Sequence, residues 1–204
     1  SNGPAAIFAL KFYNIDNNSD DLEWAKMIYA WEKATLVDPQ TGLVWDNIDL
    51  KDGEAVINKD WILTYNQGTF IGAAAGLYSV TNDRTYLNDA IKTSKAIMTS
   101  PKVTSEGLLR NENQGDGGLF KGILVRYFAS FIQEPDLSET DRNKFTKFFR
   151  FNAESFFEKG ISRPSMMSSP DWRTQPGDET DLSTQLSGVM LMEAAAQLKE
   201  EEIL

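Results

Sequence analysis

The stretch "TYNQGTFIGAAAGLY" at residues 64–78 decides the class of fold. Its apolar positions recur at helical spacing and predict a helix: Phe70, Ala74, Leu77 and Tyr78. Glycine and alanine keep its first turns small, which is typical of a helix approached closely by its neighbours. A cap needs only one polar residue, yet the helix opens on Tyr65, Asn66 and Gln67. We expect the surplus polar side chains to face a hydrogen-bonding cavity.

The same periodicity along the chain predicts seven helices and an all-α class. Their ranges are 4–15, 20–36, 66–81, 83–99, 117–133, 139–158 and 183–198. Strand signals are confined to the segment between the second and third helices, where Lys51-Asp52-Gly53 is expected to turn a small β-hairpin. Segments 3–31 and 68–97 share one plan of two helices joined by an Asx-rich turn. Repeated helix hairpins of this kind stack as solenoids or closed toroids.

The connections between helices fall into two lengths. Those inside a hairpin are short, whereas residues 37–65, 100–116 and 159–182 form long connections between hairpins. In an alternating array the long connections meet where the first helix of each hairpin begins. We therefore expect the functional face at that end.

The composition of the chain limits the functions and the catalytic chemistry that it can have. The 204 residues suit a single domain, 1–204, and the net charge of −10 argues against a nucleic-acid partner. No stretch is apolar enough to span a membrane, and no signal sequence opens the chain. The chain contains neither cysteine nor histidine, so thiolate and imidazole catalysis are excluded, and we expect no metal or cofactor. Hydrolytic chemistry here must rest on carboxylates.

The aromatic residues divide by position. Trp24 and Trp31 lie seven apart on a helix and are expected to pack. Trp45, Trp61 and Trp172 lie in the long connections, where they form either sugar-stacking faces or small satellite cores. In "KFTKFFRFNAESFF" (144–157) we expect four phenylalanines to form a buried stripe and two to lie off it: Phe145, Phe148, Phe149 and Phe156 on the stripe, Phe151 and Phe157 off it.

The other polar residues at the expected functional end are carboxylates and one lysine. Asp46 and Asp116 fall there by the loop argument, and Lys121 lies one turn beyond Asp116, at one edge or the other of the site. Asp181, before the last helix, is expected to cap it.

Taken together, "GLVWDNI", "TYNQGTFIGAAAGLY", "DGGLFKGILVRY" and "DLSTQLSGVMLMEAAA" resemble glycoside hydrolase family 76, the endo-α-1,6-mannanases of bacteria and fungi. The resemblance covers nearly the whole chain. It implies an (α/α)6 toroid of two concentric helix rings, incomplete here at about seven helices. It also implies retaining hydrolysis of α-mannan or manno-oligosaccharide, a full-length monomer, and an extracellular, cell-surface or periplasmic location. The residues it implies for the substrate cleft are Tyr65, Asn66, Gln67, Trp45, Asp46 and Asp116.

The family's catalytic residues are an adjacent pair of aspartates. The doublet Asp20-Asp21 is similar to that motif, but it follows a short turn inside a hairpin and so lies at the end opposite the long connections. Acidic residues at a helix start are explained by capping and by the helix dipole. The resemblance therefore implies that the catalytic pair precedes Ser1 in a longer protein and that this chain alone is inactive.

Three other classes stay open. One is a non-catalytic glycan-binding relative, because a fold alone does not fix an activity. Another is a sugar epimerase or lyase on the same toroid, which the absence of histidine disfavours. A helical-repeat module that binds proteins is disfavoured by the clustered amides and tryptophans.

Overall fold

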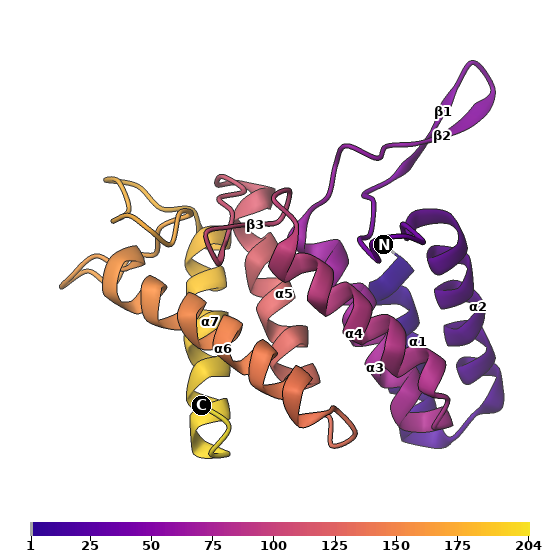
Figure 1. The fold of residues 1–204 in the computed structure, drawn as a ribbon. Coiled ribbons are helices and arrows are strands. Elements are labelled where there is room, and N and C mark those ends of the chain that lie inside the picture. The colour runs from indigo at the N-terminus through magenta and orange to yellow at the C-terminus, as the bar shows by residue number, and fades with distance from the viewer. Residues whose placement is uncertain (1) are drawn as a thin grey trace. The chain divides into compact units, whose positions relative to one another are not determined.

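The computed structural model describes residues 2–204 and divides into two compact units, one ending at Ala96 and one running from Ile97 to Leu204. The helices of the first unit are α1 (Asn2–Asp16), α2 (Ser19–Leu36), α3 (Thr64–Thr81) and most of α4 (Arg84–Thr99). The second unit holds α5 (Asp116–Ile132), α6 (Glu139–Ser155), the π-helical turn η1 (Phe156–Gly160) and α7 (Leu182–Glu200) (Figure 1). The expected all-α class and the seven helices are confirmed for these residues.

Local capping explains where the helices begin and end. Asn18 caps α2, because its side-chain oxygen accepts a hydrogen bond from the Asp20 amide at 3.1 Å. Ser138 caps α6 in the same way by accepting from the Asp141 amide at 3.1 Å. Helix α3 ends at Thr81 and is capped by Asn82, whose left-handed backbone (φ 55°) directs its N–H to Tyr78 O at 2.8 Å.

The expected β-hairpin is present between α2 and α3. Strands β1 (Ile48–Lys51) and β2 (Glu54–Ile57) pair antiparallel, with Lys51 opposite Glu54. Asp52 and Gly53 between them both have positive φ, 53° and 84°, as a two-residue turn of the type I′ kind requires. Figure 1 shows this hairpin projecting beyond the helix ends of its unit.

A second hairpin was not predicted. Strands β3 (Thr104–Ser105) and β4 (Leu108–Leu109) are two residues each, too short for a periodic pattern. The hairpin is held by a side chain from α6: Asn152 accepts from the Leu109 amide at 2.9 Å and donates to Gly107 O at 3.0 Å.

In the first unit, α1 and α3 pack at glycine-lined contacts. A Cβ on Gly3 would lie 2.7 Å from Thr69 Oγ1, and one on Gly76 would lie 2.8 Å from Leu10 Cδ1. Helix α2 covers α3 through Tyr29, whose ring stacks on Phe70 with centroids 5.0 Å apart. The small residues of α3 therefore serve close helix packing, as the sequence indicates.

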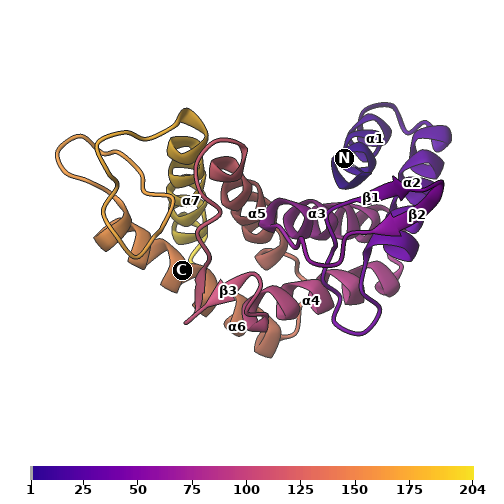
Figure 2. The same cartoon turned by 90° about the horizontal axis from the view of Figure 1, so that it is seen from above.

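In the second unit, α5 and α7 lie side by side (Figure 2) and are joined through one hydroxyl. Ser187 Oγ accepts from the Gly122 amide at 2.9 Å and donates to Gly118 O at 2.6 Å. Gly118 and Gly122 are one helical turn apart, so the hydroxyl inserts where α5 has no side chain.

The expectation that Trp24 and Trp31 pack in the core is wrong for this structure. Their exposed fractions are 58% and 46%. The buried face of α2 is instead lined by four other residues: Ala25, Tyr29, Glu32 and Leu36. The two tryptophans do share a face, but α1 and α3 contact α2 on another one.

The phenylalanine stripe of α6 and η1 is confirmed. Phe145, Phe149 and Phe156 are at most 1% exposed and Phe148 is 9% exposed. Phe151 and Phe157, predicted off the stripe, are 45% and 49% exposed. None of the helices formed by residues 2–204 is long and apolar enough to cross a membrane.

Candidate functional site

Three of the six predicted cleft residues meet in one cluster at the start of α3. Tyr65 Oη donates to Asp46 Oδ1 at 2.7 Å, and Asn66 Nδ2 donates to the same oxygen at 2.8 Å. Asp46 precedes the β1–β2 hairpin, so the long connection folds back onto the first turn of the helix that follows it. Hydrogen bonds to a carboxylate are about twice as strong as neutral ones, which fixes the three side chains relative to one another.

The Tyr65 phenol stays a hydrogen-bond donor at all physiological pH values. Burial, followed by its hydrogen bond to Asp46, raises the pKa of Tyr65 to about 12. An acceptor carboxylate, a phenol O–H and an amide thus stand together, which is the set of groups that sugar hydroxyls require.

Gln67 does not line the candidate site, although from the sequence we expected it to face the substrate cleft. Its side chain has an exposed fraction of 0%. Its Nε2 donates to Val44 O at 2.7 Å and to Leu63 O at 3.0 Å, while its Oε1 accepts from the Val44 amide at 2.8 Å. Because backbone groups use its amide on both sides, Gln67 holds the connection that carries Asp46 and is corrected from a substrate ligand to a structural residue.

Trp45 lies half-buried beside the cluster. The Lys59 ammonium sits 4.9 Å from the centroid of its ring, a cation–π contact. The Trp45 amide donates to Leu36 O at 2.8 Å, and the Asp46 amide donates to Trp61 O at 3.0 Å. Backbone bonds on both sides of the connection therefore hold Trp45 and Asp46 in place.

Asp116 belongs to the second unit. It is exposed as the first residue of α5, where a carboxylate is favoured by the helix dipole. Gly115 before it has φ 65°, and the Gly115 amide donates to Asp181 Oδ2 at 2.7 Å. Asp181 stands at the N-cap position of α7 but makes no side-chain cap bond, so its expected capping role is corrected to a tie between two long connections.

Lys121 is buried rather than placed at an edge of the site. It is 2% exposed, donates to Pro170 O at 2.5 Å, and lies 4.2 Å from the centroid of the Trp172 ring. Burial lowers the pKa of Lys121 to about 8. Trp172 is 1% exposed, so this tryptophan belongs to a satellite core of the second unit and offers no face to a sugar.

Sequence reasoning missed a buried acid, Glu32. It is 3% exposed, and its Oε2 has no hydrogen-bond partner among the described residues. Burial raises the pKa of Glu32 to about 7, opposed by a hydrogen bond from the Gly3 amide. The signal was present in the sequence, because Glu32 continues the helical spacing of Ala25, Tyr29 and Leu36.

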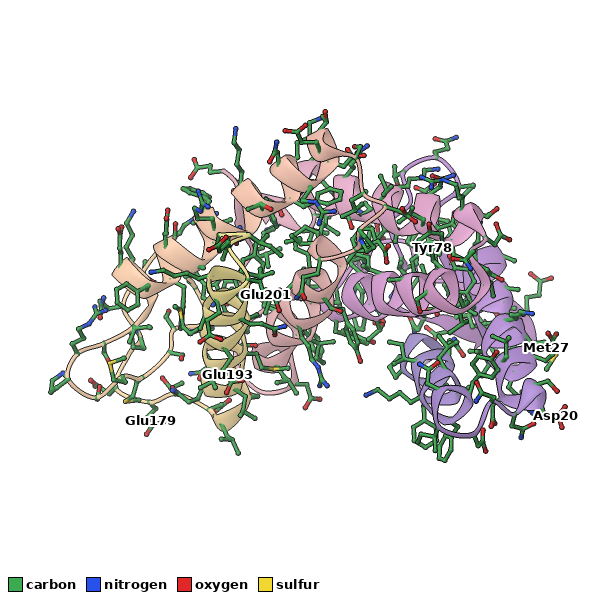
Figure 3. The ribbon with its side chains drawn as sticks, turned by 90° about the horizontal axis from the view of Figure 1, so that it is seen from below. Asp20, Met27, Tyr78, Glu179, Glu193 and Glu201 are labelled. Atoms are coloured by element: carbon green, nitrogen blue, oxygen red, sulfur yellow. The ribbon has the colours of Figure 1, made fainter. Side chains whose placement is uncertain are left out.

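The doublet Asp20-Asp21 lies in the first turn of α2, and the connection that carries Asp46 begins after its last turn. At 1.5 Å per residue, the 18 residues of α2 separate the two positions by roughly 25 Å. Figure 3 shows Asp20 at one end of the first unit, pointing away from the ribbon. The doublet and the cluster of Asp46, Tyr65 and Asn66 are therefore separate sites.

The cluster lacks the second carboxyl group that glycoside cleavage requires. Retaining glycoside hydrolysis requires two carboxyl groups about 5–5.5 Å apart, whereas the three side chains include a single carboxylate held by two donors. No group of three or more acidic side chains within residues 2–204 is arranged to hold a metal ion.

Comparison with known proteins places this fold among the α/α-toroid glycoside hydrolases. The model of glycosyl hydrolase family 76 matches residues 1–204, and the chain belongs to that family. The expected toroid class is thereby confirmed.

Solved structures of two relatives agree with this assignment. The GH76A alpha-1,6-mannanase from Salegentibacter sp. is 57% identical, with a TM-score of 0.94 over 97% of this chain and 58% of that one. The Lin0763 protein from Listeria innocua is 34% identical, with a TM-score of 0.88 over 98% of this chain and 55% of that one. This chain therefore spans a little more than half the length of either protein.

Two further findings concern function in relatives. Variants of the Salegentibacter enzyme with two consecutive aspartates replaced are described as inactive and were solved with alpha-1,6-mannotriose and alpha-1,6-mannotetrose. A protein from Schizosaccharomyces pombe, provisionally named a mannan endo-1,6-alpha-mannosidase, is 30% identical over 143 residues, which are 65% of this chain and 31% of that protein.

Proposed function

We propose that the full-length protein is a retaining glycoside hydrolase that cleaves α-1,6-linked mannan. The cluster of Asp46, Tyr65 and Asn66 carries the proposal, because a carboxylate, a phenol and a largely buried amide (Asn66, 5% exposed) lie together in a chain of family 76. The relative with 57% identity, an alpha-1,6-mannanase, supports it.

Residues 1–204 supply part of the substrate cleft in this proposal, within one domain that includes both units. Asp46, Tyr65 and Asn66 orient mannose hydroxyls, and Trp45 stacks on a ring. The catalytic aspartates come from a segment outside residues 1–204, so this chain alone is inactive. The full-length protein acts as a monomer, and it acts outside the cytoplasm because a mannan polymer does not cross a membrane.

The test uses the full-length protein and debranched yeast α-mannan. We expect release of manno-oligosaccharides, with products that initially carry the α anomer in proton NMR spectra, as double displacement requires. Replacing the two upstream aspartates with asparagine should abolish release, whereas Asp20→Asn with Asp21→Asn should leave it unchanged. Initial β-anomeric products, or full activity after loss of the upstream pair, would contradict the proposed mechanism.

The binding role is tested separately. Asn66→Ala should lower kcat/KM on α-1,6-mannotetraose about tenfold, since a lost hydrogen bond to a charged or reacting partner is worth about 1.5–3 kcal/mol. Asn143→Ala, an exposed asparagine on α6, is the matched control and should have no effect. Unimpaired activity of the Asn66 variant would mean that Asn66 only holds Asp46 in place and does not contact substrate.

A non-catalytic glycan-binding protein is the second candidate. It is favoured by the single carboxylate of the cluster, which suits binding without cleavage. Binding of α-1,6-mannotetraose by the full-length wild type without any hydrolysis would identify that function.

A further inference from the structure

An exposed tryptophan, Trp61, is bonded through its backbone to the candidate site. Trp61 lies between β2 and α3 with an exposed fraction of 58%. An indole face left in water has no role in the core of the first unit. Ring C–H faces of sugars pack on such aromatic surfaces, because both are apolar and flat.

The backbone of Trp61 is held from two directions. Its amide donates to Asn58 Oδ1 at 3.3 Å, and its carbonyl accepts from the Asp46 amide at 3.0 Å. The exposed indole is therefore attached to a fixed point rather than to a loose loop. A pre-ordered side chain binds with less loss of conformational entropy than a mobile one.

The hydrogen bond from the Asp46 amide to Trp61 O also ties the backbone that carries the indole to the backbone of the candidate site. Asp46 holds Tyr65 and Asn66 through its carboxylate while its backbone holds Trp61.

Polar groups for a second sugar unit lie along the hairpin, in a hollow whose lining ends one residue before Trp61. Residues of β1, β2 and the segment before Trp61 line a hollow of about 290 Å³: Asp49, Lys51, Val56, Ile57, Asn58, Lys59 and Asp60. This volume is close to the lower end of the range for small-ligand sites. Its carboxylates and amide are groups that sugar hydroxyls can bond.

We propose that Trp61 is a stacking platform that binds a second mannosyl unit of the same glycan, next to the unit held by Asp46, Tyr65 and Asn66. This inference rests on the proposed function and adds a subsite to it. The hairpin then extends the cleft along the polymer, and longer substrates gain affinity that shorter ones do not.

The experiment measures kcat/KM of the full-length protein on α-1,6-manno-oligosaccharides from two to six units. For wild type, kcat/KM should rise about tenfold when one particular mannosyl unit is added to the substrate. The reason is that truncating a well-placed tryptophan contact costs more than about 1 kcal/mol. Trp61→Ala should remove that step, and Trp61→Phe should restore part of it. Leu50→Ala, which removes another exposed apolar side chain of the same hairpin (80% exposed), should keep the step.

The outcomes separate the platform from the proposed function. In Trp61→Ala, kcat/KM can fall by the same factor for every substrate length, or it can stay unchanged. Either result overturns the proposed stacking role of Trp61 and leaves the mannanase proposal intact. An equal loss of the step in Leu50→Ala overturns it as well, because the effect would then not require an aromatic face. A wild type that neither cleaves nor binds these glycans in calorimetry overturns both.

Discussion

Gln67 and Val44 form a closed pair of hydrogen bonds: the Gln67 amide nitrogen donates to Val44 O at 2.7 Å, and the Val44 amide donates to Gln67 Oε1 at 2.8 Å. Both residues are buried, with Gln67 at 0% exposure and Val44 at 1%. Val44 forms an isolated antiparallel bridge with Val37, and the Gln67 side-chain amide satisfies the N–H and C=O of Val44. It thereby fixes the segment that presents Trp45 and Asp46.

Gln67→Glu should strongly destabilise the full-length protein. The substitution keeps the shape of the side chain but replaces the donor with a carboxylate that faces the carbonyls of Val44 and Leu63. We expect a loss of about 3 kcal/mol in the free energy of unfolding, because two acceptors lose their donor and a charge is buried. Urea unfolding followed by circular dichroism measures it, with exposed Gln40→Glu as the control. A loss below about 1 kcal/mol would show that the connection does not depend on this pair.

Tyr65→Phe should weaken substrate binding without changing the pH dependence of activity. The phenol has a pKa of about 12, so it carries no ionisation between pH 5 and 10. Loss of its bond to Asp46 should reduce kcat/KM on α-1,6-mannotetraose about tenfold at every pH in that range. The checks are the pH–rate profile of the full-length variant and an ultraviolet titration of the phenol. A profile that gains or loses a limb on removing the phenol would mean that Tyr65 transfers a proton.

Features with local periodicity were predictable from the sequence. The phenylalanine stripe of α6 was read correctly because its spacing alone determines which side chains share a face. The same spacing placed Trp24 and Trp31 together but did not say which face α1 and α3 would cover. Glu32 was not predicted to be buried. Its helical spacing places it on the buried face of α2, but its charge favoured an exposed position.

The sequence predicted which residues form the site better than it predicted what each residue does. The sequence brought Asp46, Tyr65 and Asn66 to one end of the fold, and two hydrogen bonds join them in the structure. The role of Gln67 was not readable, because it depends on which backbone of a long connection folds back against α3. The β3–β4 hairpin depends likewise on a distant side chain, Asn152. Binding by the cluster itself stays a prediction.

Glu32 should make the stability of the protein depend on pH. Its pKa is about 7 in the folded state, above the 4.5 of an ordinary glutamate, so the folded state binds the proton more tightly. The free energy of unfolding should therefore fall as the pH rises from about 4.5 to about 7 and level off above that. Two to three pKa units correspond to about 3 kcal/mol.

Glu32→Gln tests this assignment. The variant should match wild type near pH 4, where Glu32 is neutral, and exceed its stability by up to about 3 kcal/mol near pH 8. Urea unfolding of the full-length protein at the two pH values gives the comparison. Glu54→Gln, on the exposed hairpin, is the control and should show no difference between them. A Glu32→Gln variant that is equally stable or weaker at pH 8 would mean that a positive group pairs with this acid in the complete protein.

Gly118→Ala should destabilise the second unit even though alanine favours helices. A Cβ at this position would lie 2.4 Å from Thr184 Oγ1 and 2.8 Å from the Thr184 backbone nitrogen. A side chain can rotate away from such a contact, but the backbone of α7 cannot, because Ser187 joins it to Gly118 and Gly122. Overpacking of this kind costs about 1–3 kcal/mol, more than the gain of about 1 kcal/mol in helix propensity.

The control for that variant is Gly177→Ala. Nothing lies within 4 Å of a Cβ at Gly177, so the added methyl group meets open space and should leave the unfolding midpoint unchanged or slightly raised. Calorimetry of the full-length protein should show a lower midpoint for Gly118→Ala alone. A midpoint that rises in both variants would mean that α5 and α7 separate without cost, and that the Ser187 bridge does not set the spacing of these two helices.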